Sequence, residues 1–388
     1  MKKKFPCLWG CMLTFLLFSC QTTETNEIDL SKPAGTITQK FSDIADNLRA
    51  IPLETSDSCL LSSYLEVWVG NKYIVTADRE SMHLFDKDGK HIRQLAKRGK
   101  GPGEFNSIAT FTVDEAGERL YYRDWSQRTE LRVIELNTGK NTGKISNECN
   151  DLVNLTMTQN HSLIGNSHTG IGTSKQNYEV VTLSGTGKLL SCVVADTTPI
   201  DKAKNIFKPY LCKTGNRISY WNPNTDHILF EIEDTLKIPQ LVFKLNNPFT
   251  YQKRQGNFLR IKAETNNEVM IQIHEYNIFT EEKDLFGVRI SQNSKAYNYR
   301  IGKNDRSVYL IEQFHNDLLG EVSPDFPTLT TTDGNHIFLQ KSTQQIKQLA
   351  EEQLKAGQEL TPTLKELNER LKDDDNPVII TGTFKKAI

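Results

Sequence analysis

The chain has 388 residues, of which 37% are hydrophobic, and its formal net charge is −1. This length and composition are typical of a soluble globular protein with a large core. A net charge so near zero excludes bulk electrostatic attraction to nucleic acid or to an anionic membrane surface, so we expect no nucleic-acid partner.

The first 19 residues have the layout of a bacterial secretory signal. Three lysines at positions 2–4 precede an apolar run over residues 8–18, which is too short to span a bilayer. The run ends in Ser19-Cys20, and a small residue directly before a cysteine resembles the lipobox of bacterial lipoproteins, whose cysteine is diacylated. We therefore predict a signal peptide over residues 1–19 and lipidation of Cys20. The alternatives are an ordinary cleaved signal and an uncleaved anchor.

The next segment, residues 20–40, is predicted to be a flexible tether because it begins with a polar stretch that lacks hydrophobic periodicity. A lipidated cysteine makes the membrane a partner of the chain through two or more acyl chains. We expect an outer-membrane lipoprotein of the cell envelope that faces either the periplasm or the cell surface. Acidic residues shortly after Cys20 resemble signals for surface display.

Four of the seven cysteines remain once the signal and Cys20 are set aside. Their spacing contains neither C-x-x-C nor a Cys/His metal pattern. One or two disulfides are possible in an oxidising compartment, but the spacing favours buried, unpaired thiols. The four residues are Cys59, Cys149, Cys192 and Cys212.

A repeat of about four short strands runs along the chain. The spacing of the repeat is set by three hairpin turns, each of which follows an apolar strand. These turns are Asp88-Gly89-Lys90, Thr138-Gly139-Lys140 and Thr186-Gly187-Lys188. A unit of this length with a period of two inside its strands predicts a β-propeller blade rather than a helical repeat. Six such units are expected, at residues 63–95, 108–145, 152–194, 209–245, 258–301 and 328–384.

The sixth unit is one strand short, whereas Leu48–Leu53 stands before the first unit without a blade of its own. Pairing Leu48–Leu53 as the outermost strand of the sixth unit would close the ring and remove its free edges. Pro52 suits an outer strand, where one N–H can be missing. The fold class is therefore all-β: a monomeric six-bladed propeller over residues 41–388, closed by an N-terminal strand.

A helical insertion is predicted in the last blade, over residues 342–372. Thr361-Pro362 forms an N-cap followed by proline at the first helical position. An apolar stripe on one face predicts that the helix caps part of the core, and a lid over the propeller is the alternative. The stripe consists of Leu360, Leu364, Leu367 and Leu371.

A glycine-rich segment, Arg98–Phe105, follows the first blade. Its G-x-G-P-G-E-F sequence resembles a signature of six-bladed propeller lipoproteins of gut-type anaerobic bacteria, which are related to NHL-repeat and TolB-like propellers. Further similarities lie at 51–55, 85–90, 316–320 and 375–378. The resemblance implies the fold and the envelope location but no reaction.

We interpret this signature as a structural crossover loop, in which glycines allow positive φ angles and proline stiffens the chain. A phosphate-binding loop is excluded because the G-x-x-x-x-G-K-[ST] order is absent and a strand follows instead of a helix. The signature residues are Gly99, Gly101, Pro102, Gly103 and Glu104.

Catalytic and metal-binding patterns are not readable from spacing. The eight histidines include no H-x-x-x-H or H-x-H pair, and Ser184 of a Ser-Gly-Thr-Gly turn lacks the helix of a nucleophile elbow. Propellers assemble ligands in the central channel from separate blades, so four residues at strand ends are candidates there, although turn or surface roles are favoured. They are Asp78, Asp124, His274 and Glu275.

Two short motifs, Asp196-Thr197-Thr198 and Asp234-Thr235-Leu236, resemble acceptors of a bacterial O-glycosylation system, so Thr197 and Thr235 are candidate modification sites. For the whole chain we expect a lipid-anchored, non-enzymatic binding module for a glycan, a peptide or an envelope protein. The alternative is a hydrolase or lyase with a divalent cation in the channel, and no cofactor is identified.

Overall fold

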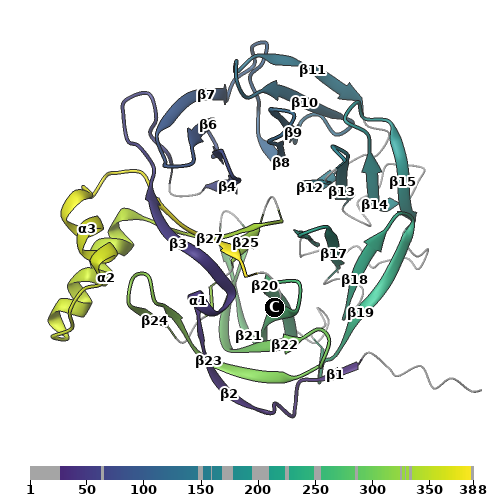
Figure 1. The fold of residues 1–388 in the computed structure, drawn as a ribbon. Helices are drawn as coiled ribbons and strands as arrows, with labels where there is room; N and C mark the ends of the chain where they lie inside the picture. Colours follow the sequence, from purple (N-terminus) through teal and green to yellow (C-terminus); the bar gives the residue numbers. More distant parts are fainter. Residues whose placement is uncertain are drawn as a thin grey trace, which may run out of the picture.

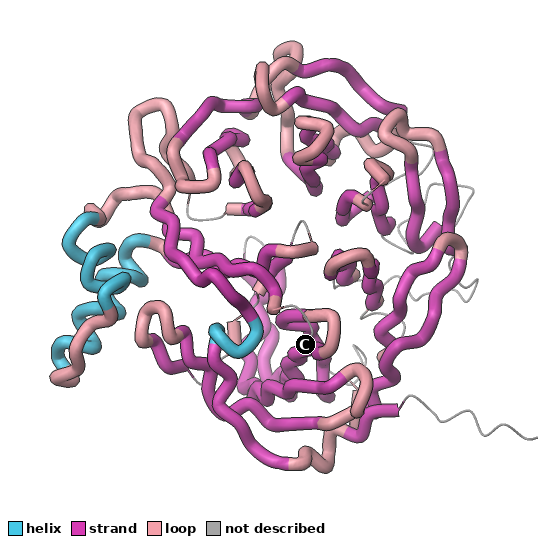
Figure 2. Tube along the Cα trace, viewed as in Figure 1, coloured by secondary structure: helices cyan, strands magenta, loops and turns pink. Residues whose placement is uncertain are grey.

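The computed structural model describes residues 27–385 except 63–64, 147–151, 159, 168–177, 195–208, 223–226, 249–254, 285–286, 324–325, 328 and 332–333. Six small, mainly antiparallel sheets stand in a ring around a central axis, and most of the described chain is strand (Figures 1 and 2). The predicted six-bladed propeller is therefore confirmed. Among the described residues, no helix combines the length and the apolar character that crossing a membrane requires.

Blades one to four place their own four strands in chain order from the channel outward. Blade one holds β4 (Glu66–Val69), β5 (Tyr73–Ala77), β6 (Ser81–Asp86) and β7 (His91–Lys97). Blade two holds β8 (Ile108–Asp114), β9 (Arg119–Asp124), β10 (Glu130–Glu135) and β11 (Asn141–Ser146). Blade three holds β12 (Leu152–Met157), β13 (Leu163–Ser167), β14 (Tyr178–Leu183) and β15 (Leu189–Val194). Blade four holds β16 (Tyr210–Thr214), β17 (Arg217–Trp221), β18 (Ile228–Glu233) and β19 (Leu236–Lys244).

Blade five is longer than predicted. It holds β20 (Gln255–Glu264), β21 (Glu268–Asp284), β22 (Gly287–Gly302), β23 (Val308–Asn316) and the short β24 (Glu321–Ser323). The prediction that this blade ends at Ile301 was wrong, because its outer strand β23 follows a further turn. The alternating pattern of Val308–Asn316 was not recognised as a strand of this blade.

Blade six closes the ring as predicted. It holds β25 (Thr330–Thr331), β26 (His336–Lys341), β27 (Val378–Phe384) and β3 (Ala45–Pro52). The N-terminal strand β3 runs antiparallel beside β27, with Ile51 opposite Ile379 and Pro52 opposite Val378. Ile51 is buried between this blade and blade one, so the closing strand contributes both backbone hydrogen bonds and core.

Part of the predicted tether belongs to the folded ring instead. β1 (Glu27–Asp29) pairs in parallel with β19, and β2 (Gly35–Lys40) pairs in parallel with β23. These segments cover outer edges whose N–H and C=O groups would otherwise be unpaired. Ile28 and Leu30 are buried against blades four and five. The prediction of a tether over residues 20–40 was therefore wrong from Glu27 onward, because backbone pairing needs few apolar side chains.

The helices lie at the outer edge of the ring, beside blades five and six (Figure 1, Figure 2). Besides the single turn α1 (Phe41–Ile44), they are α2 (Thr343–Lys355) and α3 (Pro362–Arg370). Ser342 caps α2 with a reciprocal bond to Gln345, and Thr361 caps α3 as predicted. The apolar stripe of α3 is buried against blades five and six, so the helices cover core and the alternative of a lid over the channel is wrong.

Candidate functional site

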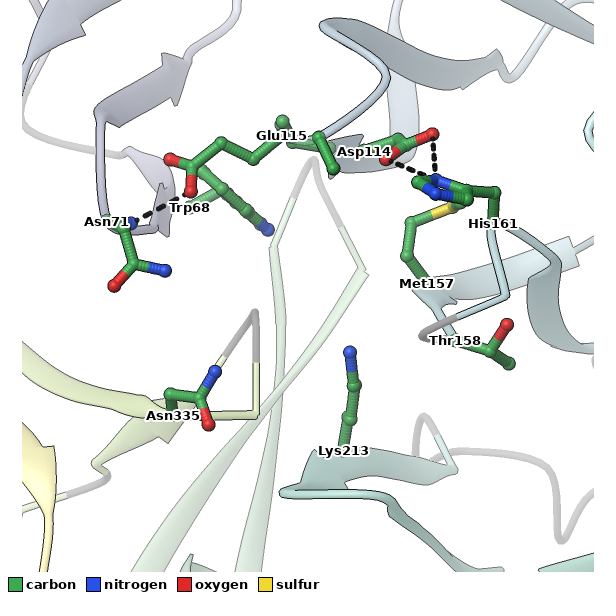
Figure 3. A pocket seen from close by; sticks show the side chains of 11 residues that line it. Trp68, Asn71, Asp114, Glu115, Met157, Thr158, His161, Lys213 and Asn335 are labelled. Atoms are coloured by element: carbon green, nitrogen blue, oxygen red, sulfur yellow. Dashed lines mark hydrogen bonds and ion pairs between the residues drawn. The ribbon is translucent and has the colours of Figure 1, made fainter.

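A cavity of about 190 Å³, lined by both polar and apolar side chains, lies at one mouth of the central channel, where the innermost strands end (Figure 3). Blades one, two, three, four and six each contribute side chains to it, so the site exists only in the closed ring. The lining residues are Trp68, Asn71, Val113, Asp114, Glu115, Ala116, Met157, Thr158, His161, Lys213 and Asn335.

An aspartate–histidine pair forms one wall. Asp114 is the last residue of β8, and both of its carboxylate oxygens lie 2.9 Å from Nδ1 of His161. Gly117 also donates its backbone N–H to Asp114, at 3.0 Å. The His161 side chain is 56% exposed while that of Asp114 is 10% exposed. The carboxylate thus orients the ring through Nδ1–H, which leaves Nε2 of a neutral imidazole as the acceptor.

Glu115, the neighbour of Asp114, joins blades one and two through hydrogen bonds. Its carboxylate accepts backbone N–H groups of Asn71, Lys72 and Tyr73 at 3.1, 2.7 and 3.1 Å. A Cβ at Gly70 would stand 2.6 Å from this carboxylate, so the turn can approach it only with glycine there. Because three backbone N–H groups of blade one engage this carboxylate, Glu115 serves the architecture of the mouth.

Lys213 and Asn335 approach the cavity from the opposite wall, and the lysine ammonium points into it (Figure 3). Lys213 stands near the end of β16, and Asn335 precedes β26. The turns that carry them are joined by a hydrogen bond from the Gly215 N–H to the Gly334 carbonyl, 2.7 Å long. Blades four and six therefore hold both side chains in place, and the cavity combines an ammonium, an amide and an imidazole.

A family model described as "Domain of unknown function (DUF4934)" matches residues 25–383. The chain belongs to this family. No curated protein matches the DUF4934 chain.

Solved structures of other proteins are similar to the DUF4934 chain. A crystal structure of a protein assigned as exported, from Bacteroides fragilis, is 14% identical, with a TM-score of 0.62 over 93% of this chain and 100% of that one. The β-propeller domain of Cps50 (Swd1) from Myceliophteria thermophila is 12% identical, with a TM-score of 0.37 over 70% and 95% of the two chains. The WD40 domain of Pan2 from Neurospora crassa is 12% identical, with a TM-score of 0.35 over 63% and 73%.

None of the four residues predicted for the channel lines the cavity of the DUF4934 propeller. Asp78 and Asp124 occupy equivalent places at the ends of the second strands of blades one and two, Asp78 just after β5 and Asp124 as the last residue of β9, where each binds a turn and the loop that enters its blade. Asp78 accepts N–H groups of Ser62, Glu80 and Ser81, and Asp124 accepts those of Asn106 and Ser126. Burial would raise the pKa of Asp124, but these hydrogen bonds outweigh it and lower the pKa. Both aspartates are structural.

The other two candidates lie on β21 of blade five. His274 bonds Gln272 of the same strand through Nε2, at 2.6 Å, and Glu275 is exposed. Sequence reasoning placed them in the channel because it took them to stand on or at the end of an inner strand. In the structure β21 runs on to Asp284 and is the second strand of its blade rather than the innermost one.

The signature loop lies between β7 and β8 and is held by its own glutamate. Glu104 accepts the Gly101 N–H at 2.7 Å, and this bond chiefly lowers the pKa of the Glu104 carboxyl. Gly103 has a φ of +83°, whereas Gly99 is needed for space, because a Cβ there would stand 1.9 Å from the Glu104 carboxylate. Pro102 lies between these contacts at the turn of the loop.

Of the remaining candidates, Cys20, Cys149 and Thr197 lie outside the described residues. Thr235 is exposed in the turn between β18 and β19, and its glycosylation stays a prediction. Cys59, Cys192 and Cys212 are unpaired thiols in the structure. The cavity residues Asp114, His161 and Lys213 were not singled out from the sequence. The available signal was their common position, at or just after the end of a blade's first strand.

Proposed function

We propose that this DUF4934 propeller is a lipid-anchored binding module of the cell envelope whose channel mouth takes a small polar group of a glycan or peptide. The observation that carries the proposal is the cavity itself, to which five blades each bring a side chain. A volume of about 190 Å³ holds a chain end or a single sugar rather than a large ligand, since drug-sized pockets start at roughly 300 Å³.

The lining favours a ligand that accepts hydrogen bonds. The ammonium of Lys213 can only donate, whereas the amide of Asn335 and the hydroxyl of Thr158 can donate as well as accept. The carboxylates opposite them are engaged by backbone N–H groups and by His161. A carboxylate or a row of hydroxyl groups therefore fits the cavity better than a cation does.

The envelope location is supported by the lysine-rich apolar signal, by the lipobox cysteine Cys20 and by the exported assignment of the similar Bacteroides protein. Binding is favoured over metal-dependent hydrolysis, because in the described part of the chain the one cluster of three His, Cys, Asp or Glu ligands shares no residue with the cavity.

Binding can be tested with the full-length protein in detergent, on an array of purified glycans and on a peptide library. For any ligand found, Lys213→Ala and His161→Ala should weaken binding at least tenfold. The control is Lys355→Ala on the remote helix α2, whose side chain is 72% exposed and which should bind as the wild type does. Equal binding by all three variants would place the ligand elsewhere and refute the proposal.

A further inference from the structure

Three potential metal ligands meet on the outer part of blade one, away from the channel mouth. One ligand atom from each of Cys59, His83 and His91 lies within 4.8 Å of the others. Cys59 is fully buried, His83 is 2% exposed and His91 is half-buried. The sequence predicted no metal site because Cys59 stands in the crossover from the closing strand β3 to blade one, far along the chain from both histidines.

The hairpin between β6 and β7 brings the two histidines together. Phe85 is opposite His91, and His83 lies two residues before Phe85 on the same face. The imidazoles are therefore diagonal neighbours across the pair of strands, with Nδ1 of His83 only 3.1 Å from Nε2 of His91. When two imidazoles bind one tetrahedral zinc at the usual Zn–N length, their nitrogens stand about 3.3 Å apart. The observed spacing thus already suits one shared ion.

A second shell of hydrogen bonds fixes the orientation of His83. Its Nε2 lies 2.9 Å from the hydroxyl of Ser81, which in turn donates to Asp78. A metal-binding histidine commonly donates its other N–H toward a carboxylate in this way, which sets the tautomer and makes the ligand more basic. Asp78, which the sequence suggested for the channel, therefore orients His83 through Ser81, and this leaves Nδ1 of His83 as the atom that can bind a metal.

Hydrogen bonds also fix the loop that carries Cys59. The side-chain amide of Asn376 donates to the carbonyls of Glu54 and Cys59, both at 2.7 Å, and accepts the N–H of Leu61 at 2.9 Å. Glu54 then accepts the backbone N–H of His91 at 2.9 Å. Asn376 and Glu54 thus hold the thiol against the histidine hairpin.

We propose that Cys59, His83 and His91 bind one zinc ion, which joins the crossover after the closing strand to blade one. One thiolate and two imidazoles form a donor set that suits zinc, and three protein ligands leave its fourth position for water. The ion would link the crossover that leaves the closing strand β3 of blade six to the β6–β7 hairpin of blade one. We expect it to stabilise the closed propeller.

The proton balance of binding is simple. Without metal, His83 donates from Nε2 to Ser81 and accepts at Nδ1 the N–H of His91. Zinc binding to Nδ1 of His83 and Nε2 of His91 moves the His91 proton to its own Nδ1, and the thiol of Cys59 loses its proton to solvent. One proton is therefore released for each zinc bound, and the thiolate and the carboxylates of Glu54 and Asp78 offset the charge of the ion.

The test uses full-length protein in detergent that is equilibrated with Zn²⁺ alone, dialysed and analysed for metal. We expect one zinc per chain, and less than a tenth of that in Cys59→Ala, His83→Gln and His91→Gln. The matched control is Cys212→Ala, which removes a buried thiol that lies beside Tyr210 and Glu264 instead of histidines and should leave zinc binding unchanged.

Two further measurements separate loss of the site from loss of the fold. Circular dichroism should show intact β-structure in His91→Gln, whose side chain is only half-buried, and zinc should raise the melting temperature of the wild type but not of this variant. Co²⁺ should give a thiolate-to-cobalt absorption band that Cys59→Ala lacks and Cys212→Ala keeps. A folded wild type without stoichiometric zinc, or zinc retained by His91→Gln and Cys59→Ala, would overturn the proposal.

Discussion

At the scale of single residues, a buried ion pair in blade five, which also binds hydroxyl groups of blade four, constrains the packing of these two blades. The Lys303 ammonium lies 2.6 Å from the Glu264 carboxylate, and their side chains are 7% and 0% exposed. The Ser219 and Tyr210 hydroxyls also donate to the carboxylate, at 2.5 and 3.3 Å. Removing one partner of such a pair leaves an uncompensated buried charge.

Lys303→Met should therefore lower the free energy of unfolding by about 3–5 kcal/mol, as measured by urea denaturation. The double variant Glu264→Gln with Lys303→Met should recover much of that loss, because it buries no charge. A single variant as stable as the wild type would show that water reaches this carboxylate.

The buried His83 makes stability depend on pH. Its pKa is lowered to about 4, below the 6.5 of an unfolded histidine, so between these values the unfolded chain binds a proton that the folded chain does not. Its contribution is complete above pH 6.5 and is lost as the pH falls toward 4, by about 3 kcal/mol in all.

With a chelator present, urea denaturation at pH 4 and pH 7 should thus show a smaller loss of stability on acidification for His83→Gln than for the wild type. The groups that face this ring are His91, Asp78 and Cys59, and they are common to both proteins. Equal losses in the two proteins would mean that His83 is protonated in the folded state.

Residue types alone could not reveal the cavity at the channel mouth or the cluster of Cys59, His83 and His91. Asp114 and His161 are 47 positions apart and belong to different blades, and they meet only because their inner strands stand side by side around the channel. Likewise Cys59 approaches His83 only through a crossover that Asn376, near the other end of the chain, holds in place. Sequence spacing reports local chemistry, whereas a propeller assembles its sites from distant turns.

At the scale of elements, strands with a clear alternation and a glycine turn were predictable. The hairpin turn at Gly89 and the closing strand Leu48–Leu53 lie where the pattern placed them. Segments with few apolar residues, such as β1 and β2, could not be predicted as strands. They are ordered by pairing with the free edge of a neighbouring blade. That edge is a property of the assembled sheet.

The closing strand offers a direct measurement of what closure contributes. Ile51→Ala should cost about 2–5 kcal/mol, because the side chain is 3% exposed and packs between blades six and one. Thr36→Ala on the added edge strand β2 is the control and should change stability by less than about 0.5 kcal/mol, since this side chain is exposed. Comparable losses in both would mean that β3 is no more essential to the ring than β2.

At the scale of the whole molecule, N-terminal segments complete the outer side of three blades: β3 is the outermost strand of blade six, and β1 and β2 cover the outer edges of blades four and five. The described part of the ring therefore begins at Glu27, only a few residues beyond Cys20. If Cys20 is acylated, the propeller is held close to the membrane. The tether between lipid and ring is then much shorter than the sequence suggested.

A short distance between the propeller and the membrane requires that Cys20 is acylated, and replacing Cys20 tests this. In cells that process bacterial lipoproteins, Cys20→Ala should abolish incorporation of a labelled fatty acid and move the protein from the membrane fraction to the soluble fraction, because stable anchoring needs two acyl chains. Cys192→Ala, which removes a partly exposed thiol on β15, should keep both the label and the membrane location. Label retained by Cys20→Ala, or absent from the wild type, would contradict the lipoprotein prediction and leave the ring unanchored.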